Sequence, residues 1–401
     1  MTDSAPQTRP QIRLRPNKSP QRLRHGFPWA YENELVLDRR SRKIPAGAVV
    51  DLLSSDKEHL AVCAFNPSSK IACRVLDRAA SVQINQDWLE NRLAQALALR
   101  ERCYDAPFYR LVHAEADGFP GLIIDRFDDV LVVQPNAAWI EQRLELLVPA
   151  LEKITGATTI IKNASSRARA LEGLDSETRV LSGATESALP VAMNGAIYQA
   201  DVMGGQKTGL YFDQRDNHAF AARLARDARV LDVFSHVGGF SLAALAGGAA
   251  SAMAVDGSQA ALDLAAQGAE ASGFGSRFTT RRGDAFDVMN ELVEAHEKFD
   301  LVVCDPPAFA PSKPALDAGL RAYERIARLG ARLVAPGGYL VLCSCSHAAD
   351  LARFREVSLR GIGRAGRQGQ VLHTGFAGPD HPVHPHLAES AYLKAIFLRL
   401  L

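Results

Sequence analysis

The 401-residue sequence lacks the features that mark several specialised classes of protein. No apolar run approaches the roughly 18 residues of a membrane-spanning helix, and the segment up to Pro16 has no apolar core of a secretion signal. Tandem repeats and low-complexity tracts are missing as well. With 47% apolar and 23% charged residues, the composition is that of an ordinary globular protein. We therefore expect a cytoplasmic protein with no membrane partner, long enough for about two or three domains.

Cysteine is scarce and widely spaced. No pair has CxxC spacing and no cysteine–histidine group has zinc-binding spacing, so we expect no structural metal. A chain of this length without a secretion signal is also not expected to depend on disulfides. The six cysteines are Cys63, Cys73, Cys103, Cys304, Cys343 and Cys345.

Acidic residues are missing from residues 9–24, which hold six arginines and lysines, although the net charge of the whole chain is only +1. A solvated basic tail is the commoner explanation of such a run. Trp29 and Tyr31 follow close to Arg24, and bases interleaved with aromatic rings are typical of nucleic-acid surfaces. A lone tryptophan more often fills a small core, so both roles stay open for Trp29. Arg24 and Trp29 are the candidates here for contact with RNA.

The spacing of apolar residues predicts three domains. In residues 9–78, short apolar runs alternate with turn residues, which is typical of a small β-barrel. Residues 79–189 mix strands with helices, which predicts an α+β middle domain. In residues 190–401 strands alternate with helices, which predicts an α/β domain with a doubly wound sheet.

Within the middle domain, apolar residues at helical spacing predict helices at 87–102 and 140–154. Residues 165–174 are polar and basic, and we expect them to form a loop with Arg167 and Arg169 on the surface. Contact of these arginines with RNA stays an open alternative.

Acidic residues stand at the ends of four predicted strands in the last domain: Asp232, Asp256, Asp284 and Asp305. Open parallel sheets bind ligands along the carboxyl ends of their strands. Gly238 lies in the turn after the first of these strands, where glycine lets the backbone approach a ligand and a helix N-terminus offers free N–H groups. The turn is not GxGxxG, which argues against a dinucleotide. A carboxylate at Asp256 can accept both ribose hydroxyls, and Asp284 can meet an adenine amino group.

This ordered set resembles the class I S-adenosylmethionine (SAM)-dependent methyltransferases over residues 191–401. The resemblance implies a Rossmann-like domain with SAM as cofactor, lying along the glycine turn and held partly by the strip Phe212–Arg215. The implied cofactor residues are Phe234, Ser235, Gly238, Gly239, Asp256, Gly257, Asp284, Ala285, Asp305, Gln214 and Arg215.

The strand FDLVVC runs into Asp305-Pro306-Pro307-Ala308-Phe309, a form of the DPP[FY] signature of methyltransferases that act on planar bases. Pro306 and Pro307 fix φ and remove two backbone donors, so the turn is rigid. Phe309 is placed to stack on a base. An exocyclic amino group needs no covalent help to accept a methyl group, whereas carbon 5 of a pyrimidine first needs a thiolate added to carbon 6.

Cysteine at the end of the next strand decides between these reactions. Cys343 and Cys345 share a face if the strand continues, and Cys345 lies further toward its carboxyl end. We assign the commoner role of a small buried apolar residue to Cys343 and Cys304, and the role of nucleophile to Cys345. Asp305 would hydrogen-bond or protonate the cytosine ring edge. The base that removes the carbon-5 proton is not identified.

Motifs along the whole chain resemble the bacterial large-subunit (23S) ribosomal RNA 5-methylcytosine methyltransferase I family, which joins a PUA domain to the methyltransferase domain. They are RLRHGFPW (22–29), ADGFPGLIIDRF (116–127), GQKTGLYFDQRDNH (205–218), DPPAF, SCS and DHPV (380–383). The resemblance implies SAM, an RNA cytosine, Cys345 as nucleophile and an N-terminal RNA-binding domain. Two departures are His218, where the family commonly has Arg, and the Gly-, Arg- and Gln-rich segment 361–375.

These observations predict an enzyme that uses SAM to form 5-methylcytosine in ribosomal RNA. One alternative is an N-methyltransferase of RNA or a small molecule on the same fold. The other is a non-catalytic RNA-binding factor of ribosome assembly. A homodimer is kept as an alternative to a monomer, and the target nucleotide is left open.

Overall fold

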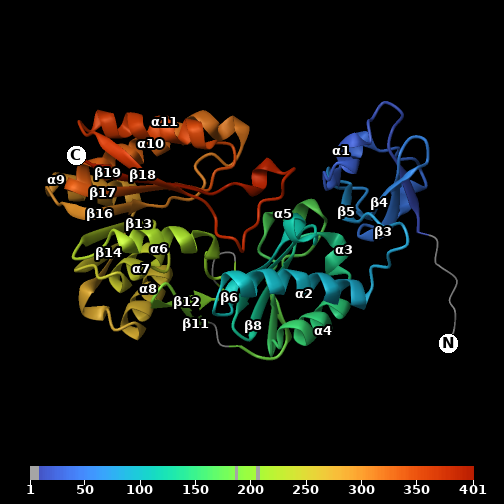
Figure 1. Cartoon of the computed structure of the whole chain (residues 1–401), viewed down its shortest axis with the longest axis horizontal. Coiled ribbons are helices and arrows are strands. Elements are labelled where there is room, and N and C mark those ends of the chain that lie inside the picture. The colour runs from blue at the N-terminus through green and yellow to red at the C-terminus, as the bar shows by residue number, and fades with distance from the viewer. Residues whose placement is uncertain (1–8, 186–187, 205–207) are drawn as a thin grey trace. The chain divides into compact units, whose positions relative to one another are not determined.

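The computed structural model describes residues 9–185, 188–204 and 208–401 (Figure 1). These residues form two compact units. The first runs up to Thr185 and includes Pro382–Leu387, and the second comprises Ala188–His381 and Ala388–Leu401. The start of the GQKTGLYFDQRDNH motif, residues 205–207, lies outside the described ranges. The finer three-domain division stays a prediction.

The first unit contains two five-stranded sheets. One has the strand order β1-β3-β4-β5-β2 and buries a small apolar core that includes Val50, Leu52 and Phe65. The other has the order β10-β9-β8-β7-β6 and packs against α2 and α4. The bounds are β1 (Gln11–Arg13), α1 (Gln21–Arg24), β2 (Trp29–Ala30), β3 (Ala48–Leu53), β4 (His59–Phe65), β5 (Cys73–Asp77), α2 (Gln86–Cys103), β6 (Phe108–His113), β7 (Leu122–Phe127), β8 (Val130–Pro135), α3 (Ala138–Glu141), α4 (Leu144–Thr155), β9 (Thr159–Lys162), α5 (Arg167–Leu171) and β10 (Arg179–Ser182).

The second unit is a layered α/β domain. Its seven-stranded sheet has the order β15-β14-β13-β16-β17-β19-β18, with α9, α10 and α11 on one face and α6, α7 and α8 on the other (Figure 1). The bounds are β11 (Ala188–Met193), β12 (Ala196–Asp201), α6 (Arg215–Arg223), β13 (Arg229–Val233), α7 (Gly239–Ala246), β14 (Ser251–Asp256), α8 (Gln259–Ala271), β15 (Phe278–Arg282), α9 (Ala285–Glu294), β16 (Phe299–Cys304), α10 (Leu316–Leu333), β17 (Val334–Ser344), α11 (Leu351–Arg364), β18 (Gly369–Gly375) and β19 (Lys394–Leu400).

Strands β13 to β17 are parallel, and β19 runs antiparallel between β17 and β18. The parallel strands are nearly continuous apolar runs because helices cover both of their faces, as in Leu231, Val302 and Leu340, which are fully buried. The predicted α/β fold is therefore confirmed. Across the ranges given above, no helix is both long and apolar enough to span a membrane.

Two local predictions in the first unit are wrong. The helix expected at 140–154 is interrupted, because Arg143 leaves the helical conformation and its guanidinium donates to the carbonyl oxygens of Trp139 (2.8 Å) and Gly47 (3.3 Å). The expected basic loop contains the short helix α5, and Arg169 is 1% exposed rather than on the surface. Its guanidinium donates to Glu141 Oε2 at 2.9 Å, so this arginine is held inside the protein. Arg167 is exposed, as expected.

Candidate active site

The carboxyl ends of the parallel strands lie in register along one edge of the large sheet. Val233 of β13 pairs with Val255 of β14 and with Cys304 of β16, and Cys304 pairs with Leu342 of β17. The segments that follow these strands therefore emerge at the same edge. These segments carry the glycine turn, Asp305 and Cys345, and Asp256 is the last residue of β14.

The turn after β13 has an unusual backbone. Phe234 (φ +64°) and His236 (φ +50°) occupy the left-handed region although neither is glycine, and Gly238 (φ +81°) follows. Such conformations persist where surrounding bonds enforce them, and they cluster at functional sites. Here the N–H of His236 donates to Asp256 Oδ2 at 2.9 Å, and the N–H of Ser235 donates to the carbonyl of Val255 at 3.0 Å.

The residues of this turn suit a cofactor. Ser235 is 5% exposed, and its Oγ has no hydrogen-bond partner within the described part of the chain. A buried hydroxyl of this kind requires a polar partner, which a ligand at the turn can supply. A Cβ added at Gly257 would meet nothing closer than the carbonyl oxygen of Gly283, at 4.0 Å, so the ends of β14 and β15 leave room beside them. The unpartnered hydroxyl and the open space beside Gly257 therefore fit a ligand with polar groups, such as SAM, in their chemistry.

The carboxylates predicted to bind the cofactor also have structural roles. Asp256 Oδ1 accepts the N–H of Ser258 at 2.8 Å, while Asp284 caps α9 by accepting the N–H groups of Phe286 and Asp287. Each carboxylate oxygen has more than one acceptor direction, so these bonds leave capacity for a ligand. Ala285, which follows the cap, is buried at the start of α9.

Asp232 lies beneath the turn rather than in it. Its side chain is fully buried, and Oδ2 accepts both the N–H (2.9 Å) and the Oγ–H (2.8 Å) of Ser241 in α7. Burial raises the pKa of Asp232 to about 6. This carboxylate ties β13 to the helix that follows the glycine turn, so it supports the turn from inside.

The strip Phe212–Arg215, which leads into α6, contacts the predicted catalytic carboxylate Asp305. Gln214, in the 3₁₀ turn Phe212–Gln214, donates from Nε2 to Asp305 Oδ2 at 2.9 Å. Asn217 in turn donates from Nδ2 to Gln214 Oε1 at 2.6 Å. Arg215 is buried, with its guanidinium over the Phe212 ring at 5.6 Å from the centroid. The structure therefore places Gln214 on the proposed catalytic carboxylate.

A hydroxyl network joins the segments that follow β16 and β17. The Tyr323 hydroxyl, from α10, lies 2.7 Å from Ser346 Oγ and accepts from Ser344 Oγ at 2.9 Å. Ser346 Oγ also accepts the N–H of Ala310 at 2.9 Å, and the N–H of Phe309 points to Tyr323 at 3.4 Å. Tyr323 of α10 therefore links the DPPAF segment to the SCS segment, and these hydrogen bonds fix the two segments relative to each other.

Cys345 lies between two buried serines but is itself partly exposed. Strand β17 ends at Ser344, so the alternation assumed from the sequence stops one residue before Cys345. Cys343 and Cys304 are buried, and burial raises the pKa of both thiols. The three thiols thus separate into two buried ones and one that reaches the surface of the site.

The predicted base-binding residues lie at the same edge. Pro306 is buried and Pro307 exposed. The Phe309 ring packs against Tyr323 (5.0 Å between centroids) and Phe286 (6.0 Å), which fixes its position but leaves it only partly buried.

The two RNA candidates of the first unit lie close together in sequence, Arg24 as the last residue of α1 and Trp29 as the first residue of β2. Trp29 donates from its indole nitrogen to Glu115 Oε1 at 2.8 Å, and its ring packs edge-on against Phe27 and Tyr31. Arg24 is exposed and paired with Glu58. Trp29 thus has a structural contact and also belongs to an aromatic group that is not fully buried.

Sequence reasoning missed three side chains near Cys345: Tyr211, Tyr323 and Lys394. Burial, followed by the charges of Asp213 and Asp305 among others, raises the pKa of Tyr211 to about 12. Tyr211 directly precedes the FDQR strip, so its place in that motif was an available signal. Tyr323 and Lys394 lie within ordinary helix and strand patterns, which carry no comparable signal.

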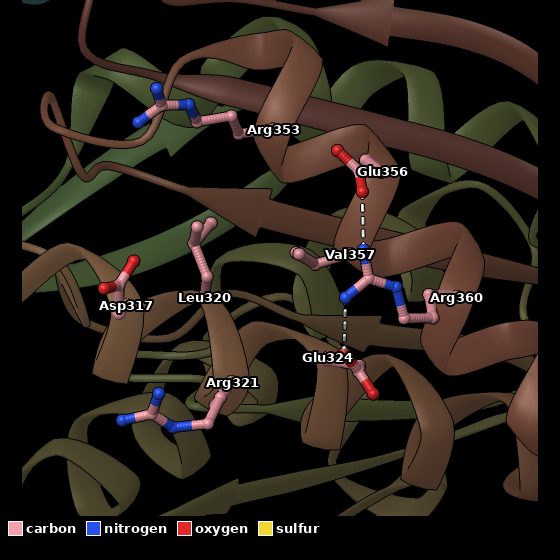
Figure 2. A pocket seen from close by; sticks show the side chains of 8 residues that line it. All are labelled: Asp317, Leu320, Arg321, Glu324, Arg353, Glu356, Val357 and Arg360. Atoms are coloured by element: carbon pink, nitrogen blue, oxygen red, sulfur yellow. Dashed lines mark hydrogen bonds and ion pairs between the residues drawn. The ribbon is translucent and has the colours of Figure 1, made fainter.

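A groove of about 430 Å³ lies between α10 and α11 (Figure 2). All of its lining residues belong to these two helices, and not to the segments that follow the strands. Arg360 bridges Glu324 and Glu356 across it, so it is a seam of ion pairs between two helices. The lining residues are Asp317, Leu320, Arg321, Glu324, Arg353, Glu356, Val357 and Arg360.

Comparison with known proteins agrees with this geometry. A family model described as S-adenosylmethionine-dependent methyltransferase matches residues 109–399, and a PUA-like domain model matches residues 12–78. A ribosomal RNA large subunit methyltransferase I of Alteromonas mediterranea is 35% identical over 96% of this chain and 98% of its own length. A protein of the same name from Aeromonas salmonicida is 36% identical over 94% of this chain and 96% of its own.

Solved structures share the fold. A chain described as a SAM-dependent methyltransferase from Streptococcus mutans superposes with a TM-score of 0.80 at 19% identity, covering 97% of this chain and all of its own. A methyltransferase crystallised with SAH (S-adenosylhomocysteine) gives a TM-score of 0.81 at 19% identity, covering 98% of this chain.

Proposed function

Because the chain belongs to the SAM-dependent methyltransferase family, together with the ribosomal RNA large subunit methyltransferase I proteins, we propose that it methylates carbon 5 of a cytosine in 23S ribosomal RNA. The position of Cys345 is the observation that favours carbon 5 over an exocyclic amino group as the methylated atom. Its thiol is partly exposed at the edge that also carries Asp305. An exocyclic amino group would need no thiol there, whereas carbon 5 does.

The residues around the glycine turn hold the cofactor in this proposal. Ser235 Oγ, the backbone near Gly238 and Gly239, and Asp256 form one side of the site, with Asp284 and Ala285 on the other. Gln214, in the 3₁₀ turn before α6, and Arg215, the first residue of α6, complete the set of cofactor residues. SAM supplies an electrophilic methyl group when it is bound.

The chain's own groups carry the remaining chemistry. The Cys345 thiolate adds to carbon 6 of cytosine, and a carbon–sulfur bond forms as electron density moves to carbon 5. Carbon 5 would then take the methyl group, with S-adenosylhomocysteine as the leaving group. A base would remove the proton from carbon 5, and the bond between carbon 6 and Cys345 would break to return the thiolate. Asp305 hydrogen-bonds the ring edge and stabilises the adduct. Gln214 orients Asp305 by donating to its Oδ2.

The target base has to leave its stack to reach this edge. Phe309 then offers a fixed ring face, and Pro306 and Pro307 keep the turn rigid. In the first unit, the PUA-like region with Arg24 and Trp29 would contact RNA outside the target nucleotide. A contact between Arg24 and the phosphate backbone would position the enzyme without specifying the base.

The test is Cys345→Ala, assayed with ribosomal RNA prepared from cells that lack the gene. We expect methyl transfer to fall by at least about 1000-fold, and the stable adduct with RNA containing 5-fluorocytidine to disappear, since no thiol adds to carbon 6. Mass-spectrometric mapping of the RNA locates the methyl group.

Cys103→Ala is the matched control, because Cys103 is exposed and belongs to the first unit. It should keep both the activity and the adduct. Retention of most activity in Cys345→Ala would instead favour an N-methyltransferase. A wild-type protein that binds no SAH in calorimetry would favour a non-catalytic assembly factor.

A further inference from the structure

Lys394 has a buried ammonium group next to the segment that carries Cys345. It is the first residue of β19 and lies directly opposite Ser344, the last residue of β17. Only 4% of Lys394 is exposed. A lysine is seldom buried to this extent unless specific partners compensate for its lost hydration.

Its partners are backbone oxygens of one short segment. Lys394 Nζ donates to the carbonyl of Ser346 at 2.6 Å and to the carbonyl of Ala349 at 2.7 Å. These carbonyls follow Cys345 and precede α11, so the ammonium draws the turn after the cysteine into a fixed shape. Both acceptors are neutral, and the positive charge is therefore not cancelled by the bonds that hold it.

The charge acts on nearby ionisable groups. Lys394 interacts electrostatically first with Cys345 and then with Asp350, and burial lowers the pKa of Lys394 to about 8. It therefore remains largely protonated near neutral pH. Tyr211 and Tyr323 also interact electrostatically with Cys345, and neither can carry a positive charge. Asp305, which interacts with Tyr211, would oppose a thiolate rather than favour it.

We propose that Lys394 is a positioning residue for the reaction: it fixes the turn after Cys345 and its charge keeps that thiol in the reactive thiolate form. This rests on the proposed function, since it concerns the nucleophile named there. A cation beside a cysteine favours the thiolate. Lys394 needs no contact with RNA or SAM for this effect, and it forms no bond during the reaction.

The test measures the thiol directly, without RNA. The full-length protein carries Cys103→Ser to remove the exposed thiol, and alkylation of Cys345 by iodoacetamide is followed by peptide mass spectrometry as a function of pH. Lys394→Gln keeps N–H donors for the two carbonyls but loses the charge, and Lys394→Met loses both. We expect alkylation near pH 7.5 to slow by about tenfold in both variants, and its midpoint to move to higher pH. Lys394→Arg should restore the wild-type profile.

Lys298→Met is the matched control. Lys298 also donates to a backbone carbonyl, that of Arg332, but it precedes β16 and so lies at the opposite edge of the sheet. It should leave the profile unchanged. An unchanged profile in Lys394→Gln would overturn the proposal, and this variant decides the matter if Lys394→Met does not fold. Failure of the proposed function is distinguishable, because it would appear as methyl transfer surviving in Cys345→Ala.

Discussion

The proposed cofactor end of this sheet edge, around the turn after β13, and its proposed reaction end, around Asp305 and Cys345, are built in different ways. At the cofactor end, the shape comes from the backbone, because Phe234, His236 and Gly238 have left-handed conformations. Asp256, at the end of the next strand, holds this turn by accepting the N–H of His236. At the reaction end, side chains from distant parts of the chain meet. Gln214 bonds Asp305 across 91 residues of sequence.

The difference shows what each half requires. A cofactor with fixed features can be bound by a local turn and a cap, whereas a reaction needs several groups held together in space. Tyr323, which contacts both serines around Cys345, and Lys394, which bonds the next turn, belong to elements whose main role is packing. Substitutions at the reaction end should therefore impair turnover more than SAH binding, and substitutions at the cofactor end should do the reverse.

Asp305→Asn should give the largest effect. The amide oxygen can still accept from Gln214, so the geometry is kept while the charge and proton-transfer capacity are lost. We expect kcat to fall by about 100- to 10,000-fold, with SAH affinity within a few-fold of wild type. Methyl transfer from labelled SAM and calorimetry with SAH provide the two readouts. A loss confined to SAH affinity would place Asp305 at the cofactor end and weaken the division.

Gly238→Val tests the cofactor end. Gly238 has φ +81°, and an added Cβ would lie 3.2 Å from the Cβ of Ala265, so a branched residue strains the turn in both conformation and space. We expect SAH binding in calorimetry to weaken by about 100-fold. Alkylation of Cys345 should remain unchanged, because the reaction end has its own bonds.

Gly273→Val is the control for strain alone. Gly273 has φ +73° with nothing within 4 Å of an added Cβ, and it follows α8 away from the turn. It should lower thermal stability but not SAH affinity. Equal weakening of SAH binding in both variants would mean that general destabilisation, rather than the shape of the turn, explains the result.

The same division explains what could be predicted from the sequence. The strand–helix alternation and the acidic strand ends are local patterns, so the order of elements in the second unit and its confirmed fold class were accessible. Trp29 in the two-residue strand β2, and β18 within the Gly-, Arg- and Gln-rich segment, carry no apolar periodicity and were not predicted as strands. Both depend on pairing with another strand.

Side-chain partners were harder still to predict. No spacing rule links Lys394 to Ser346 or Tyr323 to Ser344, because their contacts exist only after β17, α10 and β19 have packed. Arg169 was placed wrongly for the same reason, since its partner Glu141 comes from another helix. Cys345 was identifiable because it follows a strand, although the strand ends one residue earlier than expected.

His218 blurs the division and gives the smallest predicted effect. His218 lies in α6 and is 4% exposed. Its ring centroid is 4.4 Å from that of Phe240, and the ring lies against Gly239. His218, from another helix, therefore supports the turn that is proposed to bind the cofactor. Burial lowers the pKa of His218 to about 3. In the unfolded chain the same histidine takes up a proton near pH 6.5, while in the folded protein it stays neutral.

The unfolded state therefore binds the extra proton as the pH falls below about 6.5, and stability is lost progressively down to about pH 3. Between pH 7.5 and 5.5 this amounts to about 1.4 kcal/mol. Other groups, such as Asp232, also titrate in this range, so the readout is a difference: between the two pH values, urea unfolding should show the wild type losing about 1.4 kcal/mol more stability than His218→Phe. His373→Phe is the control, since His373 also packs against a phenylalanine ring but is exposed. An unchanged pH dependence in His218→Phe would mean that His218 is not held neutral, and that the cofactor turn is as local as its backbone suggests.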